Sequence, residues 1–215
     1  MSLLTKIFQK QCSKAHWERT YQKKAPDEVT WYQRVPSVSL ELISNAGVPS
    51  NGRIIDMGGG ASTLVDRLLS AGYRNLEVLD ISGSALLEAK ARLSILASRI
   101  RWTEADVTTH QFEDAAYDLW HDRAVFHFLT APGQKKAYKE ALSKALRPGG
   151  HIVISTFSLE GPRRCNGLPV ARYDAAGLSK ELGEGYTLIE SRGEIHIAPT
   201  GHRQGFVFGL FRKEG

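Results

Sequence analysis

The sequence predicts a doubly wound α/β fold, in which a largely parallel sheet carries helices on both faces and ends in an antiparallel hairpin. From residue 36 onward, short apolar runs alternate with amphipathic stretches. Strands that are separated by helices need crossover connections, so they pair in parallel. The last two strand-like runs have only a turn between them, and we expect them to pair antiparallel at the edge of the sheet.

The first predicted elements are a helix, a strand and a second helix. The helix over 36–46 is rich in apolar residues and ends at Gly47. The strand over 53–57 is a short apolar run that leads into three glycines. The helix over 62–71 has its apolar residues on one side, and Gly72 ends it.

Three strands and one helix follow. The run over 76–80 is apolar up to its final acid, and 100–104 begins with an apolar residue after a helical stretch. That stretch, over 85–97, has leucines at helical spacing. The run over 117–121 completes this part as a further strand.

The last part of the chain holds one more helix and three strands, which makes seven strands in all. The helix over 134–146 ends before Pro148-Gly149-Gly150, which is a strong stop signal. The run over 151–157 is strongly strand-like. The runs over 186–195 and 204–212 form the expected hairpin.

Composition places the chain among ordinary globular proteins. Of its 215 residues, 42% are hydrophobic and 24% charged, which argues against disorder, collagen and coiled coils. No apolar run approaches the roughly 18–20 residues of a membrane span. The two cysteines, Cys12 and Cys165, lie far apart, so neither a disulfide scaffold nor a metal site is expected. The cytoplasm is the default expectation.

The net charge of +5 lies in the first residues of the chain. Residues 1–24 hold six basic side chains against Glu18 alone, and the remainder is balanced. Nucleic-acid-binding proteins usually spread basic residues over a face of the fold, so no nucleic-acid partner is expected. The basic segment fits a solvated helix face, and it could also attract an acidic partner or a membrane surface. Its resemblance to a transit peptide is superficial, because no arginine precedes Arg19.

A glycine-rich turn joins the first strand to the helix that follows it. Gly58, Gly59 and Gly60 let the chain turn tightly and let a ligand approach the backbone. Ligands of such folds lie beyond the carboxyl ends of the strands. The dinucleotide fingerprint needs a third spaced glycine at position 63, where the chain has Thr63, and no P-loop pattern is present.

Three acids stand at or just after the ends of successive strands. Asp56 lies two residues before the glycines, where a carboxylate favours a cationic or amine-bearing ligand. Asp80 ends the second strand and can accept from both hydroxyls of a ribose. Asp106 follows the third strand and can accept from an adenine amine. Together the three acids describe a site for an adenosine with a positively charged amino-acid tail.

These residues resemble those of class I S-adenosylmethionine-dependent methyltransferases. The resemblance covers about residues 15–212 and rests on the 56–60 turn, Asp80, Ala105-Asp106-Val107 and the 147–150 stop signal, with Ser62 where many members keep a glycine. It implies a Rossmann-like seven-stranded sheet and S-adenosyl-L-methionine as cofactor. The expected cofactor-binding residues in this domain are Asp56, Gly58, Gly59, Gly60, Asp80, Ile81, Asp106, Val107, His121 and Asp122.

Four aromatic residues precede the first strand. Trp17, Tyr21, Trp31 and Tyr32 resemble the W-x-x-x-Y…W-Y segment of a subgroup similar to methyltransferase types 11 and 12 and to METTL-like lysine methyltransferases. In that subgroup the aromatic residues close over the cofactor, and aromatic faces attract a sulfonium. We therefore expect residues 1–35 to form a basic, aromatic arm or lid and residues 36–215 to form the methyltransferase domain. A helix that simply packs on the core is the alternative.

The segment after the fourth strand carries the expected catalytic residues. His127 follows Arg123 by four residues, so on a helix both could face the acceptor, with His127 as the base. In lysine-methylating relatives the similar stretch reads acid-Lys-Gly-x-x-Asp. Here Asp122 and Arg123 fit its start, but His127 replaces the closing acid, which argues against a lysine acceptor.

The acceptor is expected to meet the loop over 157–173 and the hairpin. Arginine density there favours an anionic acceptor. The leading hypothesis is methyl transfer to a neutral or anionic small molecule. The alternatives are a protein-lysine methyltransferase, a non-catalytic adenosine-ligand binding protein and a nucleotide-dependent oxidoreductase. The substrate candidates are Arg163, Arg164, Cys165, Arg172, His196 and Arg203.

Overall fold

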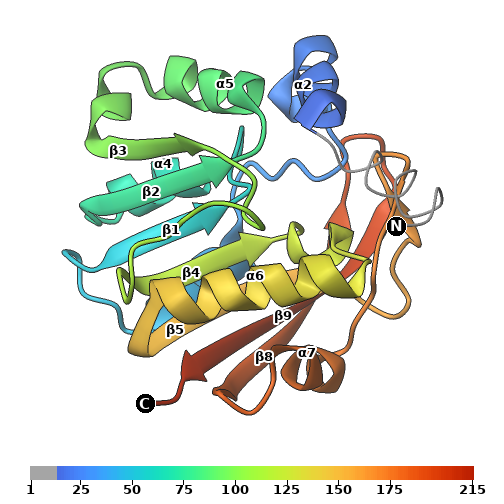
Figure 1. The fold of residues 1–215 in the computed structure, drawn as a ribbon. Coiled ribbons are helices and arrows are strands. Elements are labelled where there is room, and N and C mark those ends of the chain that lie inside the picture. The colour runs from blue at the N-terminus through green and yellow to red at the C-terminus, as the bar shows by residue number, and fades with distance from the viewer. Residues whose placement is uncertain (1–13) are drawn as a thin grey trace.

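The computed structural model describes residues 14–215, in which seven strands form one mixed sheet in the order β3-β2-β1-β4-β5-β9-β8 (Figure 1). The first five of these strands in chain order pair in parallel. β9 lies antiparallel between β5 and β8, so the predicted α/β sheet with its terminal hairpin is confirmed. The bounds are β1 (Arg53–Met57), β2 (Asn75–Asp80), β3 (Ile100–Glu104), β4 (Tyr117–Arg123), β5 (Leu146–Phe157), β8 (Tyr186–Ile197) and β9 (Arg203–Lys213).

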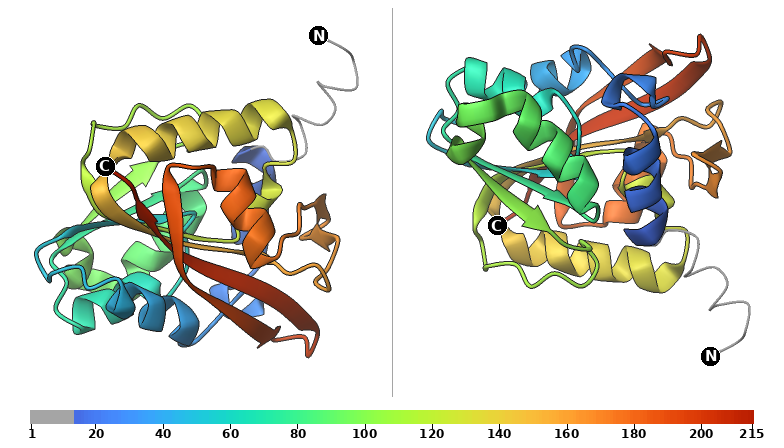
Figure 2. Two further views of the ribbon diagram at one scale, coloured as in Figure 1. Left: turned by 90° about the horizontal axis from the view of Figure 1, so that it is seen from below. Right: turned by 90° about the horizontal axis from the view of Figure 1, so that it is seen from above.

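Helices cover both faces of this sheet (Figures 1 and 2). α3 (Ser37–Asn45), α4 (Leu64–Ser70) and α5 (Gly83–Leu93) contribute buried leucines to one apolar cluster. α6 (Pro132–Ala145) and α7 (Ala175–Leu182) bury theirs in another. Neighbouring residues of a strand point to opposite faces, and Ile54 and Ile55 of β1 belong to the two different clusters accordingly.

Some boundaries differ from the sequence predictions. α5 ends at Leu93 because Ser94 adopts a positive φ of 52°, and a 3-10 turn, η2 (Ser94–Arg99), replaces its expected last turns. β5 already begins at Leu146, so the predicted stop signal lies inside a strand. The register of β4 and β5 shifts beside this stretch, since Pro148 has no N–H to donate. α7 and a short hairpin, β6 (Arg164–Cys165) with β7 (Leu168–Pro169), were not predicted.

The described part of the N-terminal segment begins at the side of the sheet to which the arrows of β1, β2 and β4 point (Figure 1). α2 (Lys14–Lys23) packs on α5, where the Glu18 carboxylate accepts from the backbone N–H groups of Gly83 (2.6 Å) and Ser84 (3.2 Å). A carboxylate at a helix N-terminus satisfies donors that have no partner within the helix. The chain then continues through a 3-10 turn, η1 (Pro26–Glu28), towards α3. The basic residues before Lys14, and Cys12, lie outside the described residues.

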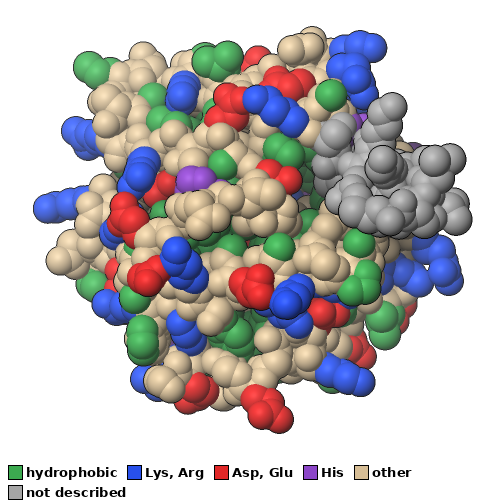
Figure 3. Space-filling view, in the orientation of Figure 1, with side chains coloured by type: hydrophobic (Ala, Val, Ile, Leu, Met, Phe, Trp, Pro, Cys, Tyr) green, Lys and Arg blue, Asp and Glu red, His purple; other side chains and the backbone are tan. Residues whose placement is uncertain are grey.

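Acidic and basic side chains are mixed over the face seen in Figure 3. This mixture agrees with the balanced charge of the chain after its first residues. Among residues 14–215, no helix is both long enough and apolar enough to cross a membrane.

Candidate active site

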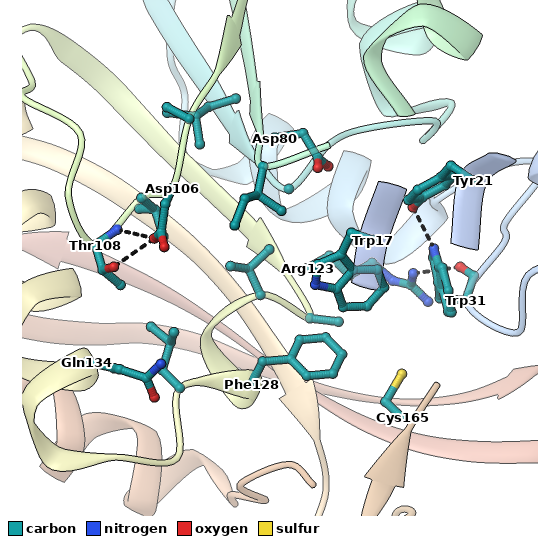
Figure 4. Close-up of a pocket in the computed structure, with 18 of the residues that line it drawn as sticks. Trp17, Tyr21, Trp31, Asp80, Asp106, Thr108, Arg123, Phe128, Gln134 and Cys165 are labelled. Carbon is teal, nitrogen blue, oxygen red and sulfur yellow. Dashed lines mark hydrogen bonds between the residues drawn. The ribbon is translucent and has the colours of Figure 1, made fainter. Parts of the chain in front are cut away.

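A cavity opens at the carboxyl ends of the parallel strands, and Figure 4 shows its lining. It receives side chains from the ends of β2 and β4, from the loop after β3, from α2 and from the C-terminal half of the chain. Of the predicted cofactor-binding residues, it is lined by Trp17, Tyr21, Trp31, Gly58, Asp80, Ile81, Asp106 and Val107.

Asp80 is held at the end of β2 by its own loop. Its carboxylate accepts from the backbone N–H of Ser82 at 2.8 Å, and its side chain is buried. Burial, together with the nearby charge of Asp56, raises the pKa of Asp80 to about 7. Gly60 does not line the cavity, but a Cβ there would stand 2.6 Å from Asp80 Oδ2. Glycine at position 60 therefore makes room for the Asp80 carboxylate.

Asp106 is oriented by the turn that follows β3. Its Oδ1 accepts from the backbone N–H of Thr108 at 2.8 Å and from the Thr108 hydroxyl at 2.7 Å. Figure 4 shows these two bonds, which orient the Asp106 carboxylate in the lining of the cavity. Ile81 and Val107 supply apolar walls between the two acids.

A second cavity adjoins the first along the glycine turn. Of the predicted cofactor-binding residues, Tyr32, Asp56, Gly59 and His121 line only this second cavity. Tyr21, Trp31, Gly58 and Arg123 line both cavities, so the two compartments are continuous across these side chains. Gly58 has a φ of +62°, and a Cβ there would collide with Val125.

Asp56 belongs to a buried chain of polar side chains in the second cavity. Asp56 Oδ1 lies 2.6 Å from His121 Nδ1, and His121 Nε2 lies 2.9 Å from Ser39 Oγ. Asp56 and His121 are register partners on β1 and β4, so the sheet itself brings them together. Ser39 comes from the first turn of α3 and had no signal in the sequence beyond its place near a helix start.

Three of the four predicted aromatic residues of the N-terminal segment, Trp17, Tyr21 and Trp31, form one cluster beside the cavities. The ring centroids of Trp17 and Trp31 are 5.7 Å apart and those of Trp17 and Phe128 are 5.1 Å apart, both in edge-to-face arrangements. Trp31 Nε1 donates to the Tyr21 hydroxyl at 3.2 Å. The cluster thus gives the first cavity an aromatic wall from residues far apart in the chain.

The remaining wall of the first cavity combines Arg123 with the polar side chain of Gln134 and several apolar side chains. Arg123 ends β4, Phe128 follows in the 3-10 turn η3 (Phe126–Phe128), Cys165 belongs to β6 and Phe206 to β9. Burial raises the pKa of the Cys165 thiol to about 12, so the thiol is neutral. Sequence reasoning missed Phe128 and Phe206, because a single phenylalanine in an apolar run carries no local signal of a site.

His127 lies outside both cavities, and the structure does not support its predicted role as base. It is fully buried between Phe128 and Phe157, and its Nδ1 accepts only a long bond from the Phe157 N–H at 3.4 Å. Burial and the charge of Arg123 lower its pKa to about 3, so the ring is neutral. The chain after Arg123 is not an α-helix: Ala124 has a φ of +72°, and a 3-10 turn follows. Arg123 and His127 therefore do not share a face.

Other predicted residues have structural contacts instead of a place in the cavities. The Asp122 carboxylate accepts from the backbone N–H groups of Val125 and Phe126 and from the Tyr138 hydroxyl, which shapes the turn after β4. The Arg164 side chain donates to Gly167 O and that of Arg172 to Gly161 O and to the carbonyl of Leu159. The placement of these residues does not favour cofactor or acceptor contacts.

Only one of the six substrate candidates lines a cavity, namely Cys165. Arg163 and Arg203 are exposed, and neither lines either compartment. His196 is buried on β8, where its Nε2 bonds to the carbonyl of Thr30 at 2.9 Å. Sequence reasoning placed arginine density at the acceptor, whereas the arginine that lines the cavities is Arg123.

This strand order, with a glycine turn after β1, acids after β2 and β3 and a cavity beside them, is the arrangement that the resemblance to class I S-adenosylmethionine-dependent methyltransferases predicts. Residues 54–150, a little under half of the chain, match the family model described as Methyltransferase domain.

Several proteins that are similar to this chain in structure or in sequence are methyltransferases. 1,6-didemethyltoxoflavin-N1-methyltransferase of Burkholderia thailandensis has a TM-score of 0.75 with 20% identity, over 94% of this chain and 87% of that one, and shares the fold. The ubiquinone/menaquinone biosynthesis C-methyltransferase UbiE of Roseobacter denitrificans is 30% identical over 109 residues, 49% of this chain and 42% of the relative. The eEF1A lysine and N-terminal methyltransferase of Bos taurus is 23% identical over 74% of this chain but 23% of the relative. The chain spans less than half the length of these two curated relatives.

Proposed function

We propose that this protein transfers a methyl group from S-adenosyl-L-methionine to a small-molecule acceptor. The observation that carries the proposal is the pair of continuous cavities at the carboxyl ends of the strands, with acids in both and an aromatic cluster where they meet. S-adenosylmethionine, when bound, supplies a methyl group on a cationic sulfur, which a nucleophile can take directly.

The residues present fit this cofactor. Asp80, with the room that Gly60 leaves beside it, suits the two hydroxyls of a ribose. Asp106 suits an adenine amine, and Ile81 and Val107 suit the flat faces of the base. Asp56, held by His121, places a carboxylate in the second cavity, where a ligand ammonium would be stabilised.

The protein's part in the reaction is to orient the acceptor and exclude water. The aromatic cluster of Trp17, Tyr21 and Trp31 covers the junction of the two cavities, and aromatic faces favour a nearby cation. His127 does not line the first cavity. We therefore infer that the acceptor atom attacks the methyl group without His127 as a base. Alignment of the acceptor supplies the rate enhancement in this proposal.

A small acceptor is favoured by the way the cavity is covered. Asn166, in the turn of the β6–β7 hairpin, donates to the Thr20 hydroxyl at 2.9 Å and lies 3.0 Å from His16 Nε2. These contacts join the hairpin to α2 over the acceptor end, where Cys165 and Trp17 also lie. A folded protein substrate would have to displace this cover, whereas a small molecule fits beneath it.

Protein-lysine methylation is the second candidate, because the eEF1A methyltransferase resembles most of this chain. The charged side chain at the acceptor end argues against it: Arg123 would repel a lysine ammonium. The remaining acids of the first cavity, Asp80 and Asp106, belong to the proposed nucleoside end.

Two measurements test the proposal. Isothermal titration calorimetry with S-adenosylhomocysteine should show a single tight site. Absence of binding would contradict the proposed methyltransferase function. Incubation of the protein with lysate and methyl-labelled S-adenosylmethionine, followed by separation into protein and small-molecule fractions, should place the label in small molecules. Label in protein alone would favour the lysine candidate, and binding without any transfer would favour a non-catalytic binding protein.

A further inference from the structure

The guanidinium of Arg123 is held firmly but is only partly paired. Its Nη1 donates to the carbonyl of Trp31 at 2.9 Å, and its Cζ lies 4.7 Å from the ring centroid of Phe206. Its Nε and Nη2 are buried, and neither has a hydrogen-bond partner among residues 14–215. A buried donor without a partner costs free energy, and the cost is larger for a charged group.

The two unpaired nitrogens stand on one edge of the planar group. Such an edge presents two parallel N–H donors, and it matches the two oxygens of a carboxylate. The contacts with Trp31 and Phe206 fix the plane of the Arg123 guanidinium, so its Nε–H and Nη2–H donors are oriented before a ligand binds. Figure 4 shows the Arg123 guanidinium between Trp17 and Trp31, at the side of the cavity that Cys165 also borders.

None of the charged groups near Arg123 forms a hydrogen bond with its Nε or Nη2 among residues 14–215. Burial lowers its pKa to about 10, against the influence of Glu194, Cys165 and Asp56, so the side chain remains a cation. Glu194 Oε1 accepts from Gln33 Nε2 at 2.8 Å, whereas the buried Glu194 Oε2 has no hydrogen-bond partner among residues 14–215. No hydrogen bond joins Glu194 to Arg123 in the described part of the chain, so the Nε–Nη2 edge has no partner on this side. The Asp56 carboxylate is engaged by His121.

We propose that the Nε–Nη2 edge of Arg123 binds a carboxylate of the methyl acceptor, so that the acceptor is a small carboxylic acid in its anionic form. This inference rests on the proposed function. The cofactor has a carboxylate of its own, but the surroundings of Arg123 favour the acceptor. Phe206, on which the guanidinium stacks, lines the first cavity only, as do Phe128 and Cys165.

Formate, the smallest carboxylate, is the probe that tests the edge directly. The Nε–H signal of Arg123 in a proton–nitrogen NMR spectrum is assigned by its loss in Arg123→Met. With S-adenosylhomocysteine bound, formate, acetate and benzoate are titrated against the matched amides. We expect a saturable shift of this signal with at least one carboxylate and none with its amide. No saturable shift with any of the three carboxylates would overturn the proposal.

Variants separate the acceptor from the cofactor. Arg123→Met and Arg123→Lys should weaken carboxylate binding about tenfold or more, since lysine keeps the charge but not the fork. Both should bind S-adenosylhomocysteine within about threefold of the parent protein, which also shows that they fold. If S-adenosylhomocysteine binding falls more than about tenfold in Arg123→Met while 5′-methylthioadenosine, which lacks the carboxylate, binds as before, the edge holds the cofactor and the proposal is wrong.

Glu194→Gln is the matched control, because it removes the opposing charge and keeps the shape. Carboxylate binding in this variant should be unchanged or tighter. A loss as large as that of Arg123→Met would show that Arg123 merely pairs with Glu194, and it would overturn the proposal. Failure of the parent protein to bind S-adenosylhomocysteine would contradict the proposed function. The cofactor titration therefore tests the proposed function, and the carboxylate titration tests the role of Arg123.

Discussion

Replacing Asp80 by asparagine is expected to stabilise the unliganded protein and, at the same time, to abolish tight cofactor binding. Asp80 is 6% exposed, and burial raises its pKa from 3.8 to about 7. The folded protein therefore holds this proton more tightly than the unfolded chain does. Stability falls with rising pH between these two values, because the unfolded chain releases the proton first.

The size of the effect follows from the same shift. A rise of the pKa from 3.8 to about 7 corresponds to about 4 kcal/mol of unfolding free energy lost above pH 7. Asparagine keeps the shape, and its side-chain oxygen can still accept from the Ser82 N–H, so it removes the charge and retains the contact. Even about 2 kcal/mol of gain raises the Tm of a chain of this length by about 4–8 °C.

Thermal unfolding at about pH 5 and about pH 8, together with titration of S-adenosylhomocysteine, measures both effects. We expect a rise in Tm for Asp80→Asn that is larger at the higher pH. We also expect an affinity about 100-fold lower, because two hydrogen bonds to a charged oxygen are lost. A lower Tm at pH 8, or a rise that does not depend on pH, would refute the argument from burial. Unchanged affinity would remove Asp80 from the ribose site.

Three further changes test other parts of the site. Gly60→Ala should weaken S-adenosylhomocysteine binding about tenfold, because its Cβ would stand 2.6 Å from Asp80 Oδ2. Gly72→Ala is the control, because Gly72 also has a positive φ but a Cβ there would meet nothing within 4 Å, and this variant should bind S-adenosylhomocysteine normally. His127→Leu should leave kcat unchanged and shift the Tm by less than about 4 °C, and a large fall in kcat with normal cofactor binding would restore His127 as a base. Asn166→Gly keeps the φ of 47° accessible but deletes the donor to α2, so hydrogen exchange in α2 should speed up, and unchanged exchange would show that the hairpin does not hold this helix.

Most of the sheet could be predicted because its strands are short apolar runs that helices separate. α7 was missed although it has ordinary helix signals: Asp174 caps it by accepting from the Gly177 N–H, and Leu178 and Leu182 are buried. Those signals stand directly after a long segment rich in glycine and proline, which was interpreted as one loop. The two strands of the hairpin were predicted too short by one or two residues, where apolar alternation fades at their ends.

The part of the cavities that we propose for the cofactor was easier to predict than the part that we propose for the acceptor. Acids at the ends of parallel strands meet at one edge of the sheet whatever the loops do, so Asp80 and Asp106 could be placed from topology. The acceptor half depends on contacts between segments far apart in the chain, such as Arg123 with Phe206. His127 was misplaced because helical spacing was assumed for a stretch that forms a 3-10 turn.

Under the proposed function, the position of α2 and of the segment up to Trp31 would have a kinetic consequence. Tyr21 and Trp31 stand over both compartments, so a single opening motion would uncover the spent cofactor and the methylated product together. The two departures would then share one rate, and turnover could not exceed it however fast the bond-making step is. In such an arrangement, the upper limit of the turnover rate would depend on the strength of the ring contacts of Trp17 and on the hydrogen bond from Asn166 to Thr20.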